Sequence, residues 1–277
     1  MSERITSRKN PAIKLAAKLV SSAAFRRETG LFVAEGARLC RDAADSGLAV
    51  TAVYATPHAL EKYDGYLQAA VRLAGGVTEI EPHVAELLAD TRQSQGIFCV
   101  CRLPQEQRGA AQMPPDGHYL ALEQVQDPGN LGAVLRTAEA LGINGVLLLG
   151  DSCDLYAPKT LRAAMGAVFR IPVYAEQDTA VAVRQCREKG LAVLAAAPDA
   201  RAKRILTVDF AKPTVLLVGN EGNGLSRTAI ALADDCVTIP MAGRAESLNA
   251  AGAAAILMWE MMRNTKNVQG EEAVWKR

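Results

Sequence analysis

The stretch Val215-Leu216-Leu217-Val218-Gly219-Asn220-Glu221-Gly222-Asn223-Gly224-Leu225-Ser226 decides the fold class. Its four leading apolar residues predict a buried strand, and the glycines that follow predict a loop that leads into a helix. In an open α/β sheet, ligands bind where strands end in such loops, because glycine lets a ligand approach the backbone closely. The glycine spacing matches neither a dinucleotide-binding fingerprint nor a P-loop, so the stretch indicates a cradle without naming its ligand.

Strand and helix patterns alternate through the C-terminal part of the chain. Alternation of this kind predicts an α/β fold whose parallel sheet is covered by helices on both faces. The expected strands are 119–122, 145–149, 171–174, 191–196, 215–218 and 236–240, and the expected helices are 130–141, 157–165, 180–189 and 248–263.

Prolines and glycines between residues 103 and 117 mark a boundary. A chain of 277 residues is long enough for about two domains. We expect a first domain at 1–105 and a second at 116–277. The first domain reads as a small α/β unit, with helices at 10–22 and 37–46 and strands at 31–34 and 50–55.

The composition is that of an ordinary globular protein, with 49% apolar and 22% charged residues. The polar start of the chain has no signal-peptide pattern, and no apolar run approaches the roughly 18 residues that span a bilayer. The expected location is therefore the cytoplasm.

Six cysteines and three histidines are scattered along the chain. Cys99 and Cys101 share one face of a strand expected at 96–102, but no histidine stands near another or near this pair. Buried free thiols are therefore favoured over a zinc site or a disulfide framework, and no metal is expected.

Residues 1–30 are basic, although the net charge of the whole chain is only +1. Seven lysines and arginines stand there against two glutamates. Such a cluster fits either phosphate contacts on a nucleic acid or a solvated basic helix, and charge alone does not separate the two. The candidate RNA-binding residues are Arg8, Lys9, Lys14, Arg26 and Arg27.

Two further loops follow expected strands. In residues 123–132, Asp-Pro-Gly forms a tight turn, Asn130 is a good helix N-cap, and Arg136 follows on the helix. A capped helix with a surface arginine is the simpler alternative for this loop. In residues 239–249, Ser247 is the expected N-cap of a helix so apolar that it belongs in the sheet layer or at a subunit interface.

The three loops together resemble the SpoU (TrmH-type) RNA 2′-O-ribose methyltransferases of the SPOUT superfamily. The resemblance covers residues 117–263, and a weaker one likens the first 105 residues to that family's RNA substrate-binding domain. The matching motifs are Asn130 to Ala138, Leu217 to Leu225, Ile239-Pro240-Met241 and Ser247-Leu248-Asn249.

The resemblance implies S-adenosylmethionine as cofactor, bound largely by backbone groups in a C-terminal trefoil knot. It also implies a homodimer formed through the C-terminal domain. The positions expected to line the cofactor pocket are Leu217, Gly219, Ile239, Met241 and Leu248. Bulk added at Gly219 is expected to block the cofactor while leaving the fold intact.

By the same resemblance, Arg136 is the central catalytic residue, and Asn130, Glu221, Ser247 and Asn249 support substrate and geometry. One mechanism proposed for the family uses the arginine as a general base. Guanidinium does not readily lose its proton, so we favour Arg136 as an anchor for a phosphate beside the target ribose.

Two other functions were compared with the methyltransferase. A nicotinamide-dependent oxidoreductase should show G-x-G-x-x-G after its first strand, and this chain has no such element. A non-catalytic RNA-binding protein of the same fold stays as the alternative. Ribosomal RNA is favoured over transfer RNA as the substrate by family analogy, while the nucleotide and the choice between housekeeping and antibiotic resistance stay open.

Overall fold

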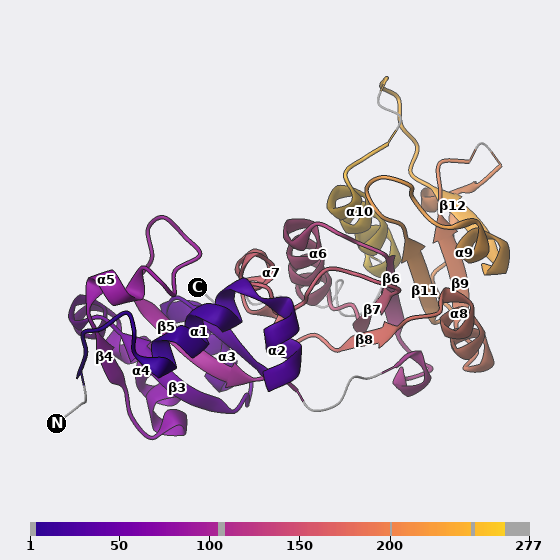
Figure 1. Ribbon diagram of the computed structural model, residues 1–277. Coiled ribbons are helices and arrows are strands. Elements are labelled where there is room, and N and C mark those ends of the chain that lie inside the picture. Colours follow the sequence, from indigo (N-terminus) through magenta and orange to yellow (C-terminus); the bar gives the residue numbers. More distant parts are fainter. Residues whose placement is uncertain (1–3, 105–108, 200, 245–246, 264–277) are drawn as a thin grey trace. The chain divides into compact units, whose positions relative to one another are not determined.

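The computed structural model describes residues 4–104, 109–199, 201–244 and 247–263. The chain divides into two compact units (Figure 1): unit 1 comprises residues 1–106 and 154–170, and unit 2 comprises residues 107–153 and 171–277. Segment 154–170 thus packs with the N-terminal unit. The sequence had suggested that all of residues 116–277, including this segment, belong to the C-terminal domain.

Unit 1 is built on a five-stranded mixed sheet in the order β1-β4-β3-β5-β2. Strands β1, β4 and β3 run parallel, and β5 runs antiparallel to both β3 and β2. The strands are β1 (Arg4–Ile5), β2 (Leu31–Glu35), β3 (Val50–Ala55), β4 (Thr78–Ile80) and β5 (Ile97–Arg102).

Three helices of unit 1 begin at capping side chains that the sequence displays, Asn10, Ser22 and Thr56. Asn10 accepts a hydrogen bond from the Ala12 N–H at 2.8 Å, and Pro11 opens the first helix, where its missing N–H costs nothing. The helices are α1 (Pro11–Ser21), α2 (Ala23–Thr29), α3 (Ala37–Asp45), α4 (Pro57–Ala74), α5 (Pro82–Ala85) and α7 (Pro158–Ala164), with a 3-10 turn at Ala167–Phe169.

None of the six cysteines forms a disulfide. Cys40, Cys99, Cys101 and Cys186 are buried, and Cys153 and Cys236 are partly buried, so thiols are found in place of a disulfide framework, as expected. Burial raises the pKa of the Cys40 and Cys101 thiols, which therefore stay protonated at neutral pH. These thiols serve as small apolar packing groups.

Unit 2 contains a seven-stranded sheet in the order β10-β12-β9-β11-β6-β7-β8, and every pairing in it is parallel. The predicted α/β fold with a parallel sheet is confirmed. The strands are β6 (His118–Glu123), β7 (Gly145–Leu149), β8 (Val173–Glu176), β9 (Ala192–Ala196), β10 (Lys203–Arg204), β11 (Thr214–Val218) and β12 (Asp235–Thr238).

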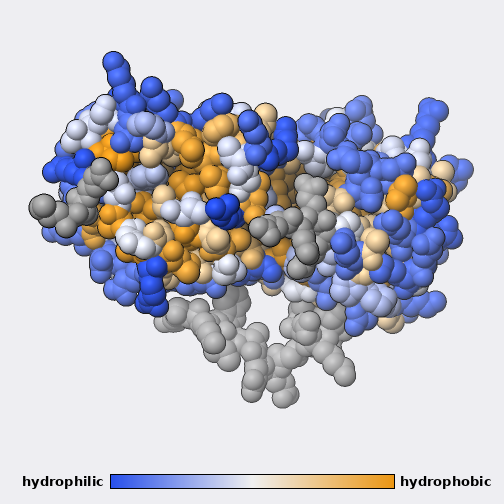
Figure 2. Space-filling view, turned by 60° about the horizontal axis from the view of Figure 1, so that its bottom comes forward, coloured by the Kyte–Doolittle hydropathy of each residue, from blue (hydrophilic) through white to orange (hydrophobic). Residues whose placement is uncertain are grey.

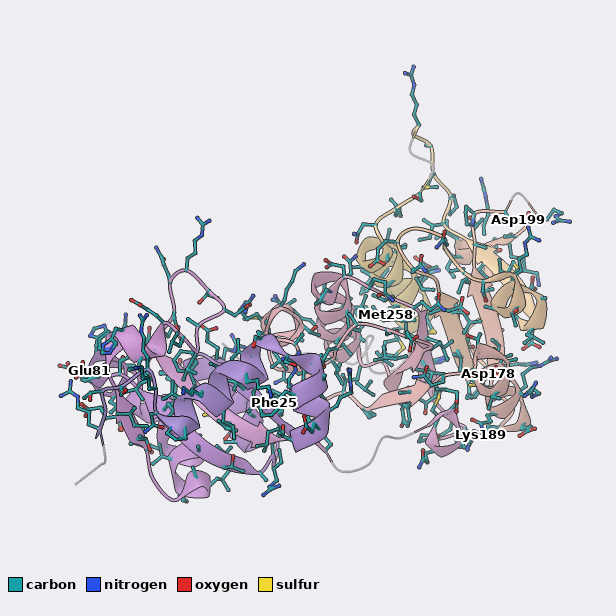
Figure 3. The ribbon with its side chains drawn as sticks, in the orientation of Figure 1. Phe25, Glu81, Asp178, Lys189, Asp199 and Met258 are labelled. Atoms are coloured by element: carbon teal, nitrogen blue, oxygen red, sulfur yellow. The ribbon has the colours of Figure 1, made fainter. Side chains whose placement is uncertain are left out.

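Helices cover both faces of this sheet. Helix α6 packs against α10 in one layer, and α8 packs against α9 in the other (Figure 1). The helices are α6 (Pro128–Leu141), α8 (Thr179–Glu188), α9 (Arg227–Leu232) and α10 (Ala250–Met262), with 3-10 turns at Ala110–Gln112 and Ile205–Thr207. Met258, labelled in Figure 3, is fully buried on α10.

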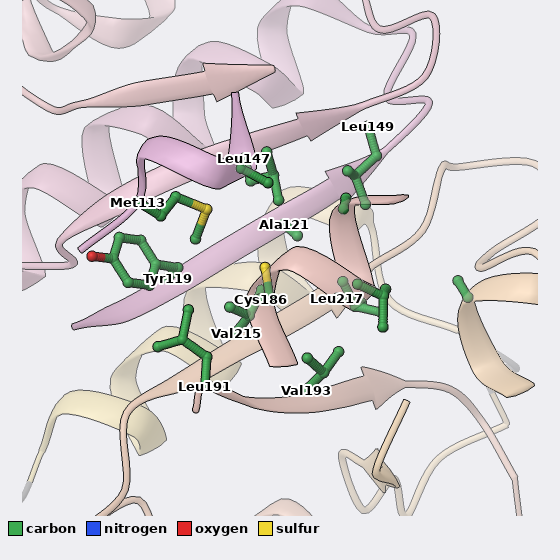
Figure 4. Packing of buried hydrophobic residues seen from close by; sticks show 14 of the residues in the cluster. Met113, Tyr119, Ala121, Leu147, Leu149, Cys186, Leu191, Val193, Val215 and Leu217 are labelled. Atoms are coloured by element: carbon green, nitrogen blue, oxygen red, sulfur yellow. The ribbon is translucent and has the colours of Figure 1, made fainter. Parts of the chain in front are cut away.

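One side of the sheet packs on α8 and α9 through a buried cluster shown in Figure 4. Tyr119, Ala121, Val215 and Leu217 supply its strand side, and Cys186 contributes from α8. These strand residues alternate along β6 and β11, because successive side chains of a strand point to opposite faces. By the same alternation, Glu123 at the end of β6 points toward the α8 and α9 layer.

Two helix starts differ from the sequence-based expectation. Helix α6 begins at Pro128 with Asp127 as its N-cap, whose carboxylate accepts the Asn130 N–H at 2.9 Å. Helix α10 begins at Ala250 with Asn249 as its N-cap, in place of Ser247. Asn130 is in the first turn of α6, and Asn249 is the N-cap of α10. The two helices follow β6 and β12 along the chain, and the two side chains lie at the edge of the sheet where those strands end.

The surface carries both kinds of side chain. In the view of Figure 2, hydrophobic residues gather over part of unit 1, and hydrophilic residues dominate the surface of unit 2. Among the residues that the structure describes, no helix has the length and apolar composition needed to cross a bilayer.

Segment 154–170 is attached to unit 1 by a buried ion pair. Arg26, 4% exposed, donates from Nε to the Asp154 carboxylate at 2.8 Å and from Nη2 at 2.6 Å, while Nη1 donates to the carbonyls of Leu19 and Val20. The ring of Phe32 packs on that of Tyr156 with centroids 4.8 Å apart. The guanidinium of Arg26 is thus an internal structural group.

Replacing Arg26 by Met should destabilise the protein by about 3–5 kcal/mol, because it leaves the Asp154 carboxylate poorly solvated and without its partner. Denaturant unfolding of the full chain measures the change in the free energy of unfolding. The matched control is Arg27→Met at the neighbouring exposed position, where we expect a change within about 0.5 kcal/mol. Equal stability of the two variants would show that the ion pair is dispensable.

Candidate active site

Three loops leave the same edge of the unit 2 sheet. Strand β6 pairs with β11 in register, with Leu122 opposite Val218. Strand β11 also pairs with β9, and β9 pairs with β12. Because all these strands are parallel, the loops that follow β6, β11 and β12 start from one edge, where open α/β sheets bind their ligands.

Three side chains, one from each of these loops, form a hydrogen-bonded chain. The Asn130 amide donates from Nδ2 to Glu221 Oε1 at 2.7 Å. The Asn249 amide donates from Nδ2 to Asn130 Oδ1 at 3.1 Å. Asn249 Oδ1 accepts hydrogen bonds from the N–H groups of Ala251 and Gly252, which fixes the orientation of the Asn249 amide. We call Asn130, Glu221 and Asn249 the strand-end cluster.

The carboxyl group of Glu221 is ionised at neutral pH. Burial raises its pKa, but hydrogen bonds from the Asn130 amide and from nearby backbone N–H groups lower it more, so the net pKa lies below the ordinary value. Because the pKa is depressed in the folded protein, the bonds to Glu221 are intact above the ordinary pKa and are lost as pH falls through the lowered one.

The loop after β11 closes on itself at Gly219. Asn220 and Gly224 exchange two backbone hydrogen bonds, at 3.3 and 3.2 Å, and Asn220 Oδ1 accepts the N–H groups of Gly222 and Asn223. A Cβ at Gly219 would stand 2.0 Å from the Gly224 carbonyl carbon. The expectation that bulk at Gly219 leaves the fold intact is therefore wrong, because the loop's own backbone occupies that space.

Glu123 is a site residue that the sequence analysis did not single out. It is 5% exposed, and its carboxylate accepts the Thr179 hydroxyl at 2.8 Å, the Ser226 N–H at 2.7 Å and the Ser226 hydroxyl at 2.8 Å. Ser226 is the N-cap of α9 and ends the loop that carries Glu221. One feature of the sequence could have identified Glu123: it is a carboxylate at the end of β6, on the same face of the strand as the buried residues Tyr119 and Ala121.

Arg136 and Ser247 lie outside the strand-end cluster. Both are exposed, and neither has a hydrogen-bond or ion-pair partner among the residues of the described ranges. Arg136 lies on α6, the same helix whose first turn carries Asn130. Its guanidinium is thus available to an external anion.

The five positions expected to line the cofactor pocket fall into two groups. Leu217 is 1% exposed and its side chain belongs to the core cluster, and Gly219 has no side chain, so both can offer a cofactor only backbone groups. Met241 and Leu248 are each 40% exposed, and Ile239 is half-buried. The exposed apolar side chains of Met241 and Leu248, in the loop after β12, suit contact with the flat ring of a cofactor.

The five basic residues expected to bind RNA also differ from one another. Arg8 is exposed but pairs with Glu86 at 2.6 Å. Lys9, Lys14 and Arg27 are exposed, and their side chains have no partner within the described part of the chain. Arg26 is buried in its pair with Asp154, so we remove it from the RNA-binding set.

Comparison with family models divides the chain in two. Residues 117–259 match the SpoU rRNA Methylase family, and residues 10–99 match the MRM3-like substrate binding domain. The first match covers all three strand-end loops.

Similar proteins span nearly the whole chain. A 23S rRNA (uridine(2479)-2′-O)-methyltransferase of Streptomyces viridochromogenes is 31% identical over 94% of this chain and 92% of its own. The 23S rRNA (guanosine(2553)-2′-O)-methyltransferase RlmP of Bacillus subtilis is 30% identical over 94% of this chain and 99% of its own.

The fold is shared with solved structures as well. An AdoMet-bound rRNA methyltransferase from Sinorhizobium meliloti has a TM-score of 0.85 and 33% identity, covering 95% of this chain and 98% of that one. The SpoU methyltransferase AviRb from Streptomyces viridochromogenes, in complex with AdoMet, has a TM-score of 0.81 and 28% identity, covering 92% and 98%. The chain belongs to the SpoU rRNA methylase family.

Proposed function

We propose that the protein transfers a methyl group from S-adenosylmethionine to a ribose 2′-hydroxyl of RNA, with ribosomal RNA as its substrate. The observation that carries the proposal is the strand-end cluster, in which Asn130, Glu221 and Asn249 meet at the edge of a SpoU-family sheet. Relatives named as 23S rRNA 2′-O-methyltransferases support the reaction, and the AdoMet-bound structures support the cofactor.

The cofactor lies, in this proposal, against the backbone at Leu217 and Gly219 and beside Ile239, Met241 and Leu248. When bound, it supplies a methyl group made electrophilic by a positively charged sulfur. The chain's own task is to hold the ribose in line with that methyl group, and positioning of this kind can lower a barrier by about 7–11 kcal/mol.

Glu221 orients Asn130 in this proposal and does not remove the proton from the 2′-hydroxyl. A general base works best when its pKa lies near the working pH, and the pKa of Glu221 is shifted away from neutrality. Its Oε1 is already occupied by the Asn130 amide. The ionised carboxylate therefore fixes the Asn130 side chain, which Asn249 holds from the other side.

Arg136 binds a phosphate next to the target ribose and stabilises the negative charge that develops on the 2′-oxygen as the hydroxyl proton passes to water. Its guanidinium is exposed and has no partner in the described ranges. A guanidinium is a donor at every working pH, so the alternative role of general base is disfavoured. Ser247 completes the catalytic set as a second contact to RNA.

We assign RNA binding to residues 1–105 and methyl transfer to residues 116–277. The match of residues 10–99 to a substrate binding domain supports the first assignment, and the match of 117–259 supports the second. Arg8, Lys9, Lys14 and Arg27 supply positive charge in unit 1, where Arg8 shares its charge with Glu86.

We further propose that the protein forms a homodimer through unit 2 and that unit 2 contains a trefoil knot around the cofactor. We also propose that the protein is located in the cytoplasm. Support for the dimer comes from α10, where Ile256 and Trp259 are 40% and 48% exposed. An apolar helix with large exposed side chains suits a subunit interface. Ribosomal RNA as the substrate supports the location.

The reaction is tested with the purified protein, methyl-labelled S-adenosylmethionine, and unmodified ribosomal and transfer RNA in separate reactions. We expect label in ribosomal RNA at one linkage that resists alkaline cleavage, because a methylated 2′-oxygen cannot attack the neighbouring phosphate. Cofactor binding without label in either RNA would instead favour the non-catalytic RNA-binding protein.

Arg136→Lys keeps the charge of the side chain but loses its planar fork. We expect kcat/KM to fall roughly 10- to 100-fold, since hydrogen bonds to charged groups are worth about 1.5–3 kcal/mol. Affinity for the cofactor, measured by calorimetry, should not change. The matched control is Arg184→Lys, at an exposed arginine on α8, and turnover of both variants at the wild-type rate would refute the bidentate role.

Glu123→Gln keeps the size of the side chain but turns an amide NH2 toward hydroxyl and N–H donors. We expect a loss of about 1–3 kcal/mol in the free energy of unfolding, and slower methyl transfer because the loop that carries Glu221 loses its support. Denaturant unfolding and single-turnover kinetics measure the two effects. Glu188→Gln, at an exposed position on α8, is the control, and a Glu123 variant as stable and fast as this control contradicts the assignment.

A further inference from the structure

Unit 1 contains a cavity of about 280 Å³ that shares no residue with the strand-end cluster. Its walls come from the start of α3, from the loop at residues 91–95, and from α7 (Figure 1). The side chains that matter below are Arg38, Leu39, Gln93, Gln95, Leu161 and Met165. All of them belong to unit 1, although α7 comes from the stretch that matches the SpoU model.

Hydrogen bonds hold the walls of this cavity in place. Gln95 Oε1 accepts the Ala37 N–H at 2.8 Å, which ties the 91–95 loop to the first residue of α3. The Glu35 carboxylate accepts the Asp90 N–H at 3.0 Å and the Thr91 hydroxyl at 2.8 Å. An ion pair between Arg162 and Asp90 joins α7 to the same loop. The cavity is therefore preformed, which lowers the entropic cost of binding a ligand there.

The polar groups that are left over are hydrogen-bond donors. The Glu35 carboxylate accepts the two hydrogen bonds above and keeps its negative charge, while Asp42 pairs with Arg170 at 3.5 Å. The Arg38 and Gln93 side chains are exposed and have no partner in the parts of the chain that the structure describes. Gln95 has committed its oxygen, and its amide NH2 is left to donate. A ligand here must be rich in acceptor oxygens, and it can carry negative charge where it meets Arg38 but not where it meets Glu35.

The remaining walls are apolar. Leu39 and Leu161 are 8% and 1% exposed, and Met165, at 40%, adds a thioether that adapts to flat surfaces. An apolar wall with a rim of donors and the Arg38 guanidinium, while Arg162 is paired with Asp90, suits a planar heterocycle that bears carbonyl groups and is attached to a phosphate. The volume of about 280 Å³ is just below the usual range for small-ligand sites, about 300–1,000 Å³, so it suits one such unit and not a helical stretch.

We propose that this cavity binds one unpaired nucleotide of the RNA substrate, with the base against Leu39, Leu161 and Met165 and the phosphate on Arg38. Gln93 and Gln95 donate to the oxygens of the base or sugar. Proteins recognise RNA chiefly through unstacked bases in loops and bulges, which a cavity of this kind can take. The inference rests on the proposed function and names a recognition site separate from the methylated ribose.

The first test uses nuclear magnetic resonance of the nitrogen-15-labelled full chain. AMP, CMP, GMP and UMP are added one at a time at up to about 10 mM, since a nucleotide held by a few contacts should bind at millimolar concentration. Inorganic phosphate and ribose 5-phosphate are added in parallel. We expect saturable shifts of the amide signals at 36–39 and 91–95 with at least one nucleotide and not with phosphate alone.

Two outcomes of this titration overturn the proposal. The absence of shifts at 36–39 and 91–95 with all four nucleotides removes the nucleotide site. Equal shifts with inorganic phosphate or ribose 5-phosphate show an anion or sugar-phosphate site that does not read a base.

The second test measures the KM for ribosomal RNA in the methyl-transfer reaction. Arg38→Ala combined with Gln93→Ala removes two exposed donors that no described residue uses, so the fold should be kept. We expect the KM for RNA to rise at least about tenfold, because contacts to phosphate and base are lost, with the KM for the cofactor unchanged. The matched control is Arg72→Ala on α4, which removes one exposed positive charge away from the cavity.

The two tests separate the cavity from the enzyme activity. Nucleotide-induced shifts in a protein that methylates no RNA would leave the nucleotide site standing and overturn the proposed function. Normal methylation, with the double variant matching Arg72→Ala in the KM for RNA, would leave the function standing and overturn the cavity's role in recognition.

Discussion

The parallel pairing of β6 with β11 is the constraint on which the rest of unit 2 depends. The two strands match residue for residue, from His118 opposite Thr214 to Leu122 opposite Val218, so they end at the same level. That shared ending brings Asn130 within 2.7 Å of Glu221, although 91 residues separate them in sequence. Buried side chains on both faces hold the pairing, and a shift of one residue would turn every one of them to the wrong face.

The strand-end loops are shaped from inside the protein before any ligand arrives. Gly219 is required because the loop returns to within 2.0 Å of where a Cβ would stand. Glu123 binds the far end of that loop through Ser226 and reaches Thr179 at the start of α8. Two separate requirements can favour glycine in such a loop: the close return of the loop's own backbone and the close approach of a ligand. The contacts at Gly219 establish the first requirement. A preorganised loop positions reacting groups without reordering them on binding.

Local patterns predicted the sheet and the three strand-end loops, because buried parallel strands are short apolar runs followed by glycines and polar residues. The order of motifs, through family resemblance, predicted which residues stand at those strand ends. Long-range packing was beyond local patterns: Arg26 reads as one of several surface charges until Asp154, 128 residues away, comes to lie beside it. Helix starts were misplaced where Asp127-Pro128 and Asn249 supplied better caps than Asn130 and Ser247. Helix α4 was missed although Thr56-Pro57 and Gly75 mark its two ends.

A crystal structure of the protein with bound S-adenosylmethionine would show whether the strand-end cluster faces the cofactor. We expect electron density for the cofactor against the backbone at 217–219, beside Met241 and Leu248, with the methyl group directed toward Asn130, Glu221 and Asn249. The bonds of Asn130 to Glu221 and Asn249 should persist in that structure. Cofactor bound away from the edge where β6, β11 and β12 end would contradict the role proposed for the strand-end cluster.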